Sequence, residues 1–341
     1  MLRFIFFCIY SSPALAVFLT NVNTKSTPSL FHEEGRYVIA NEGYPYDAIS
    51  FFNYADVGVY VSVGTERGWI GAALSKASHL LLVDYDAMAV RYNQVNVAMI
   101  KMAKNRKEYL KFRLTLSGFE DFASRLFKVP TNIDFDLARQ SLSSQEEKER
   151  IGAFFLGQED LNLPLRLVSE HHAFYNSNYL YNDEMFEHLK KMVDAGRVQA
   201  QQLDLTDQKA VSMLVDEIKK THLQVAVLDL SNVFEHLKKE RYSSMFANLK
   251  KWERVRTPNG IVLTTERLDG RLLLNSSRYA IRVGAALVWN YFAFSMSSFA
   301  QEPLNENLIA FLTLRKREKK GGQLDMAPFH FSSVRCSKLL I

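Results

Sequence analysis

Two glycines and one aspartate in the first third of the chain have types and spacing suited to a nucleotide ligand. Gly64 and Gly68 flank a short turn after an apolar run, and Asp84 follows Gly64 by twenty residues. Because glycine has no side chain, a ligand can approach the backbone of such a turn and the free N–H groups of the helix after it. A carboxylate at this separation is placed to accept hydrogen bonds from ribose hydroxyls. The alternative is a structural glycine turn followed by a solvated aspartate.

Other chemistries fit the sequence less well. The glycines read Gly64-x-x-x-Gly68-x-x-Gly71, which is not the GxGxxG of a dinucleotide site. In addition, no tyrosine has a lysine four residues later, so hydride transfer is a minor alternative. No set of His, Cys and carboxylate residues has metal-ligand spacing, and no Gly-x-Ser-x-Gly elbow occurs, so we expect neither a metal site nor a serine hydrolase.

Alternating apolar and amphipathic segments position these residues. Predicted strands cover residues 57–63, 79–83, 198–203, 223–228, 261–265 and 308–314. Predicted helices cover residues 69–76, 87–105, 207–220, 242–254 and 278–300, and 258–260 is predicted to be a turn. This alternation indicates an α/β fold with a doubly wound, mainly parallel sheet. Ligands of such sheets bind at the carboxyl ends of the strands, where the sequence places Gly64, Asp84, Asp204 and Asp229 together.

The segment from residue 108 to 197 breaks the alternation. We expect a largely helical insertion that covers the ligand pocket, within a domain of residues 50–316. His171 and His172 lie in it and could include a general base, because imidazole titrates near neutrality. Adjacent residues point apart on a helix, so a role shared by both is not expected.

The two ends of the chain differ from this domain. Residues 1–16 have a basic start, an apolar run and a small-residue site at Ala14–Ala16, which predicts a signal peptide and export to a periplasm or the cell exterior. Without such a leader we expect a cytoplasmic protein. Residues 17–49 read as a linker, and residues 317–341 as a basic tail. Cys8 and Cys336 lie at opposite ends and indicate no disulfide framework.

The net charge is mild, at +5 with an isoelectric point near 9.0. Much of the excess lies in residues 315–320 and not along a helix face, which argues against nucleic acid as a partner. The expected partner is a small molecule or a lipid, with contact to a membrane surface as an open alternative. The sequence leaves the oligomeric state open.

Several short runs resemble one enzyme family, the class I S-adenosylmethionine-dependent methyltransferases. Residues 60–68 look like its first motif, and the others that resemble it are 81–84, 202–205, 227–232 and 258–263. The resemblance implies a Rossmann-like methyltransferase fold with S-adenosylmethionine as cofactor. It also implies cofactor contacts by Gly64, Thr65, Glu66, Gly68, Asp84, Asp204 and Leu205, and an acceptor oriented by Asp229, Ser231 and Asn232.

The first motif departs from that family at two positions. Ser62 stands where an acidic residue is usual, and Glu66 where a glycine is usual, which would put a negative charge beside the ligand. These departures motivate a second hypothesis, a binding or effector protein that has lost the reaction. A third comes from residues 228–236 and 181–204, which are similar to enzymes that transfer a 3-amino-3-carboxypropyl group to diacylglycerol in betaine-lipid synthesis. Methyl transfer to an unknown acceptor remains the leading hypothesis.

Overall fold

The computed structural model describes residues 48–114, 116–126, 178–180, 182–268 and 288–299. The expected leader and basic tail lie outside these residues, and so does the expected linker except for residues 48–49. So do His171, His172, most of the expected insertion and the strand expected at 308–314. Within the described part, no helix is both long and apolar enough to cross a membrane.

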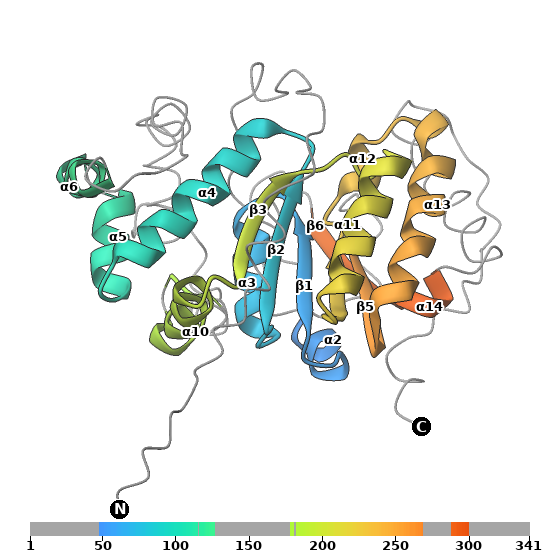
Figure 1. Cartoon of the computed structure of the whole chain (residues 1–341), viewed down its shortest axis with the longest axis horizontal. Helices are drawn as coiled ribbons and strands as arrows, with labels where there is room; N and C mark the ends of the chain where they lie inside the picture. The colour runs from blue at the N-terminus through green and yellow to red at the C-terminus, as the bar shows by residue number, and fades with distance from the viewer. Residues whose placement is uncertain (1–47, 115, 127–177, 181, 269–287, 300–341) are drawn as a thin grey trace, which may run out of the picture.

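A six-stranded sheet forms the centre of the described part of the chain (Figure 1). The strands are β1 (Val59–Val63), β2 (His79–Asp84), β3 (Val198–Gln202), β4 (Val225–Asp229), β5 (Arg256–Leu268) and β6 (Val288–Ser295). Their order is β3-β2-β1-β4-β5-β6; the first five are parallel, and β6 runs antiparallel to β5. The expected α/β class with a mainly parallel sheet is therefore confirmed.

Helices cover both faces of the sheet. Successive residues of a strand point to opposite faces and therefore pack in two different core clusters. Leu80 and Leu82 pack in one cluster, and Leu81 and Val83 pack in the other. The first cluster receives residues from α2 (Ile49–Tyr54), α3 (Glu66–Leu74), α4 (Ala87–Met102), α5 (Arg106–Leu114), α6 (Leu116–Leu126) and α10 (Asp183–Asp194). The second receives residues from α11 (Gln208–Lys220), α12 (Val233–His236), α13 (Tyr242–Trp252) and α14 (Met296–Phe299). Two short 3-10 turns, Lys239–Arg241 and Glu253–Val255, flank α13.

Local sequence signals explain where several helices begin. The Asp207 side chain accepts hydrogen bonds from the backbone N–H groups of Lys209 and Ala210, at 2.8 and 3.0 Å, and so caps α11. Asn182 caps α10 in the same way through the N–H of Met185, at 3.1 Å. The apolar faces of these two amphipathic helices are buried on opposite sides of the sheet.

The expected turn at 258–260 is wrong, because these residues lie inside β5. The register between β4 and β5 shifts there: Val225 pairs with Arg256, whereas Val227 already pairs with Ile261. This bulge explains why Pro258 is tolerated in a strand with neighbours on both sides, since the extra residues need no ladder hydrogen bond. The N–H of Asn259 is instead bound by the Asp56 carboxylate at 2.9 Å.

The helix expected at 278–300 is wrong over residues 288–295, which form the antiparallel strand β6. A continuous apolar run fits a buried helix or a buried strand equally well by its period. The aromatic composition, which includes Trp289, Tyr291, Phe292 and Phe294, favours the strand because such side chains pack well on a pleated surface. Residues 278–287 lie outside the described part.

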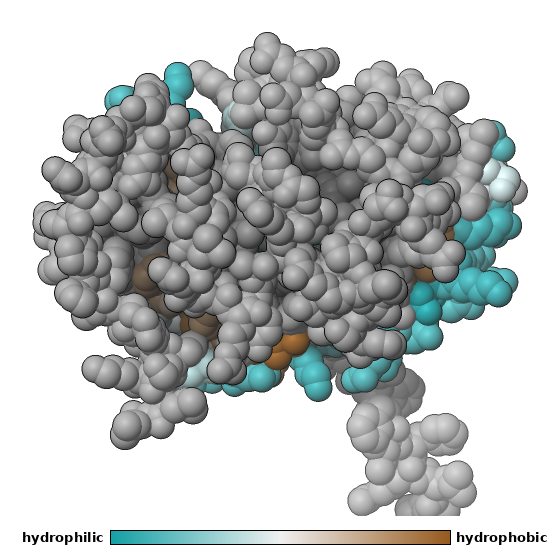
Figure 2. Space-filling model, turned by 180° about the vertical axis from the view of Figure 1, so that it is seen from behind, coloured by the Kyte–Doolittle hydropathy of each residue, from teal (hydrophilic) through white to brown (hydrophobic). Residues whose placement is uncertain are grey.

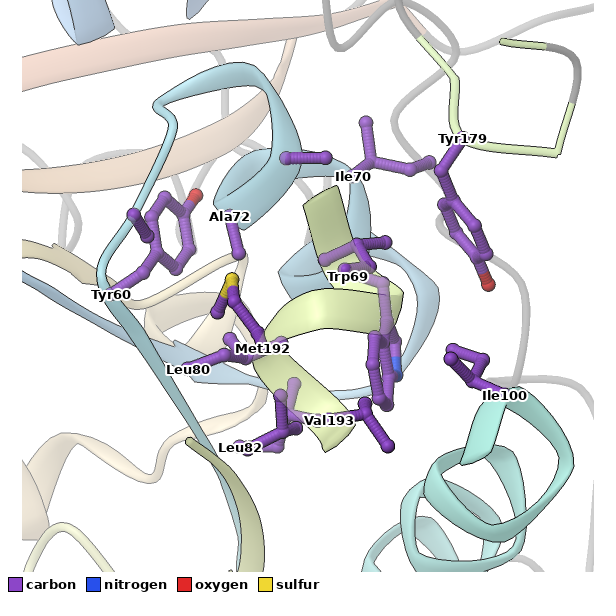
Figure 3. Close-up of a cluster of buried hydrophobic side chains, with 14 of the residues drawn as sticks. Tyr60, Trp69, Ile70, Ala72, Leu80, Leu82, Ile100, Tyr179, Met192 and Val193 are labelled. Atoms are coloured by element: carbon purple, nitrogen blue, oxygen red, sulfur yellow. The ribbon is translucent and has the colours of Figure 1, made fainter. Parts of the chain in front are cut away.

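The core beneath α3 is close-packed and aromatic. Figure 3 shows Trp69 and Ile70 of α3 beside Tyr60 and Leu82 of the sheet and Met192 of α10. From the rear, the visible described surface is mostly hydrophilic with small hydrophobic areas (Figure 2).

The contact of α3 with the sheet depends on glycine. A Cβ added at Gly71 would collide with the ring and hydroxyl of Tyr60, and one at Gly68 would lie 2.8 Å from the Ser62 Cβ. Both glycines therefore allow the helix backbone to lie directly on β1.

We predict that Gly71→Ala lowers the free energy of unfolding by about 1 to 3 kcal/mol, because the added methyl group overpacks a filled interface. Urea unfolding followed by circular dichroism measures this loss. A midpoint equal to that of the parent would show that the helix and sheet are not in this close contact.

Candidate functional site

The glycine bend, residues 64–68, leaves the end of β1 at the carboxyl edge of the sheet. Gly64 has a φ of 93°, and a Cβ built on it would meet no heavy atom within 4 Å. Asn93 of α4 holds the bend through two hydrogen bonds. Its Nδ2 donates to the Gly64 carbonyl at 2.8 Å, and its Oδ1 accepts from Trp69 Nε1 at 3.1 Å. Asn93 was not predicted from the sequence, because one amide in a mixed helix gives no signal of its partner.

Asp84 ends β2 and faces this bend. Its partly buried carboxylate accepts a hydrogen bond from the backbone N–H of Asp86 at 2.8 Å, and the N–H groups of Gly64 and Tyr85 favour its charged form. The Gly64 N–H itself donates to the Val83 carbonyl at 3.3 Å. Burial raises the pKa of Asp84 to about 7 against the opposing effect of these N–H groups. Asp84 therefore lies at the end of the strand next to β1, whose last residue Val63 pairs with Val83.

Thr65 and Gly68 stabilise the conformation of the turn through a hydrogen bond and packing. Thr65 is buried, and its carbonyl accepts a hydrogen bond from the Gly68 N–H at 3.0 Å. Gly68 packs on Ser62, whose small side chain is buried beneath it. A serine in place of the usual acidic residue thus lies in a close helix-to-strand contact.

Glu66 does not extend toward the bend's open side. Its carboxylate is fully buried and forms an ion pair with Arg113 of α5 at 2.6 Å. Tyr92 and Tyr179 donate hydrogen bonds to its two oxygens at 2.6 and 2.9 Å. A ligand contact by this side chain, as the sequence suggested, would require these bonds to break. We call the buried group of Glu66, Tyr92, Asn96, Tyr109, Arg113 and Tyr179 the Glu66 cluster.

The tyrosines of this cluster remain hydrogen-bond donors. Burial raises the pKa of Tyr109 to about 12 and the pKa of Tyr92 and of Tyr179 well above the usual value. Arg113 also donates to the hydroxyl oxygens of Tyr109 and Tyr179, at 2.7 and 3.0 Å. The guanidinium is therefore surrounded by one carboxylate and several hydroxyl groups, which compensate its burial.

Asp229 is also buried and engaged. Both of its oxygens accept from Arg67 Nε, at 2.8 and 2.7 Å, and Oδ2 accepts from the Tyr60 hydroxyl at 2.8 Å. The backbone N–H of Ser231 donates to Oδ1 at 3.0 Å. Asp229, expected to orient an acceptor directly, thus fixes the loop that follows β4.

Ser231 and Asn232 remain partly exposed at the same edge. Ser231 has a φ of 50°, which is uncommon for a residue with a side chain and is found at functional sites. Its carbonyl holds this conformation by accepting from the Thr265 N–H and the Thr264 hydroxyl, both at 2.9 Å. Asn232 precedes α12 without a side-chain capping bond to that helix.

Asp204 and Leu205 follow β3 and play different parts. Asp204 accepts from the Thr206 N–H and hydroxyl at 2.9 and 2.7 Å and pairs with Arg241. Burial opposes the charge of Asp204, but the Thr206 and Arg241 hydrogen bonds outweigh it, so the pKa lies below its usual value. Leu205 is buried in the second core cluster, and its carbonyl accepts from Asn248 of α13.

The carboxyl edge therefore brings Gly64, Asp84, Asp204, Ser231 and Asn232 to one side of the sheet. Glu66 and Asp229 belong to buried ion pairs behind it. No group of three or more His, Cys, Asp or Glu residues suited to a metal occurs in the described part of the chain. The geometry offers an accessible backbone bend beside a carboxyl group that can bind hydroxyls.

The raised pKa of Asp84 predicts a pH dependence of stability. A carboxyl group with a pKa near 7 in the folded protein and 3.8 otherwise stabilises the fold fully below 3.8, and this contribution is lost as the pH rises through 7. From pH 5 to pH 8 the parent should lose about 2 to 3 kcal/mol more than Asp84→Asn.

Urea unfolding of both proteins at the two pH values measures this difference. Asp204→Asn is the control, because a lowered pKa contributes stability at pH 5 and pH 8 alike; it should be less stable than the parent by a similar amount at both. Parallel behaviour of the parent and Asp84→Asn would contradict the raised pKa of Asp84.

The buried ion pair of the Glu66 cluster predicts that loss of Arg113 destabilises the protein more than loss of a partly exposed arginine does. Arg113→Met should destabilise by about 3 to 5 kcal/mol, because it leaves a buried carboxylate uncompensated, and adding Glu66→Gln should restore part of the loss. Arg125→Met, which removes two partly exposed ion pairs of α6, to Glu108 and Asp121, should cost at most about 1 kcal/mol. Equal losses for Arg113→Met and Arg125→Met in thermal unfolding would refute the buried pair.

Comparison with known proteins gives a family but no activity. A family model described as "Domain of unknown function (DUF7790)" matches residues 37–317, which include every described element. No curated protein matches the chain. The matched segment is more than half of the 341 residues. The chain therefore belongs to the family described as Domain of unknown function (DUF7790).

Proposed function

We propose that this protein binds S-adenosylmethionine at the carboxyl edge of its sheet and transfers a group from it. The observation that carries the proposal is the Asp84 carboxyl group at the end of β2, next to the end of β1 and to a bend with open space at Gly64. The strand order β3-β2-β1-β4-β5 is that of Rossmann folds, which supports a Rossmann-like methyltransferase fold. The motif resemblances of residues 60–68 and 81–84 point to the same cofactor.

Each residue at this edge is proposed to contact a different part of the cofactor. The backbone of Gly64 and Thr65 would meet its amino-acid end, Asp84 would bind the ribose hydroxyls, and Asp204 would lie toward the adenine. When bound, S-adenosylmethionine supplies an electrophilic carbon on a sulfonium whose leaving group is a neutral thioether. The chain's own part is then positioning, because little acid or base assistance is needed. Ser231 and Asn232 are the residues proposed to orient the acceptor.

Glu66 and Asp229 are proposed to act indirectly, without contact to the cofactor or the acceptor. The Glu66 charge is compensated by Arg113, so it does not repel the cofactor carboxylate. Asp229 binds the Ser231 N–H while Arg67 compensates its charge, so Asp229 holds the acceptor loop and does not take a proton from the acceptor. The acceptor is proposed to be a small molecule or a lipid.

A second candidate is a protein that binds the cofactor without transferring a group from it. The Arg67–Asp229 pair favours it, because this pair neutralises the carboxylate expected to orient the acceptor.

Isothermal titration of the full chain with S-adenosylmethionine tests the cofactor site. We expect micromolar affinity in the parent and at least a tenfold weaker Kd in Asp84→Ala, because the ribose hydroxyls lose their acceptor. Asp216→Ala is the control: Asp216 lies on α11 in an exposed ion pair with Arg254 and should leave the Kd unchanged. Absence of binding at millimolar ligand would reject both candidates.

The product of the bound cofactor separates the candidates. During incubation with cell extract, S-adenosylhomocysteine should accumulate if a methyl group is transferred, and methylthioadenosine if the aminocarboxypropyl group is transferred. Ser231→Ala should slow either release without changing the Kd more than about twofold. Binding with neither product would favour the second candidate.

A further inference from the structure

The Glu66 cluster joins segments that are distant in the sequence. Glu66 begins α3 directly after the glycine bend, Arg113 lies on α5, and Tyr179 precedes α10. One carboxylate oxygen accepts from Arg113 and Tyr92, and the other accepts from Tyr179 at 2.9 Å. All of these side chains are buried, so the bonds do not compete with water.

Tyr179 belongs to a segment that is docked at further points. The guanidinium of Arg106 donates to the Leu180 carbonyl at 2.7 Å and pairs with Asp183 at 2.6 Å. His188 of α10 lies 3.1 Å from the Ala77 carbonyl, just after α3. The apolar face of α10, which includes Phe186, packs in the same cluster as Trp69 of α3. The segment from Asn178 to Asp194 therefore contacts both ends of α3.

We propose that Tyr179 and Arg113 are positioning residues for the glycine bend, so that docking of residues 178–194 and the conformation of residues 64–68 are coupled. The coupling passes through the two oxygens of Glu66. Tyr179 is the only Glu66 donor among the described residues that comes from this segment, and losing it frees one oxygen while the ion pair with Arg113 remains. The first turn of α3, whose N–H groups face the bend, then loses one of its restraints.

Hydrogen exchange on the full chain without ligand tests the coupling. Tyr179→Phe removes one hydroxyl and should accelerate amide exchange at least tenfold in residues 64–68 and 183–194. Exchange in β4 and α13, which take no part in the cluster, should change less than twofold. A merely structural effect would instead accelerate exchange throughout the molecule.

Tyr242→Phe is the matched control. Tyr242 of α13 is as deeply buried, and its hydroxyl donates to the Phe234 carbonyl at 3.0 Å, outside the Glu66 cluster. It should change exchange in residues 64–68 less than threefold. Equal acceleration by the two variants, uniform acceleration in Tyr179→Phe, or an unchanged bend would each overturn the inference.

A second arm rests on the proposed function. Coupling is reciprocal, so S-adenosylhomocysteine should slow exchange in residues 183–194 of the parent, and Tyr179→Phe should weaken its Kd severalfold. If the parent fails to bind the ligand, the proposed function is rejected, and the ligand-free exchange still decides the coupling. If the ligand binds without protecting residues 183–194, the coupling is rejected and the proposed function stands.

Discussion

Two adjacent residues of opposite charge, Glu66 and Arg67, enter the interior at the first turn of α3, and the surrounding structure is arranged to compensate them. Successive helix residues point about 100° apart, so the two side chains reach different partners. Glu66 meets Arg113 beside α4 and α5, and Arg67 meets Asp229 on the sheet. Removing an ion from water costs several kcal/mol unless it is paired and hydrogen-bonded. The first turn of α3 can therefore be buried here only because both charges are paired.

These pairings decide which groups face a ligand. With both charged side chains directed away, the glycine bend presents its backbone and the open space at Gly64. Asp84 is the nearby carboxyl group, and burial raises its pKa to about 7, so only about half of the groups are charged at pH 7. Such a site suits a ligand recognised through hydroxyls and backbone contacts more than one recognised through strong charge.

The same constraint organises the loop after β4. Asp229 uses its second oxygen to bind the Ser231 N–H, and Thr264 and Thr265 hold the Ser231 carbonyl. The left-handed backbone of Ser231 is thus over-determined by neighbours on β5, a way in which proteins maintain strained residues at functional positions. Because Arg67 is part of α3, the bend and this loop share one buried ion pair.

The sequence by itself determined the five parallel strands and the edge on which Gly64, Asp84 and Asp204 lie, because apolar runs, caps and glycine turns act over a few residues. It did not determine the bulge at Pro258 or the strand 288–295, since the same local pattern fits two backbone conformations. Only the tertiary structure decided that Glu66 and Asp229 are buried in ion pairs. Their partners lie 47 and 162 residues away, and compensation of a buried charge depends on distance in space and leaves no local pattern.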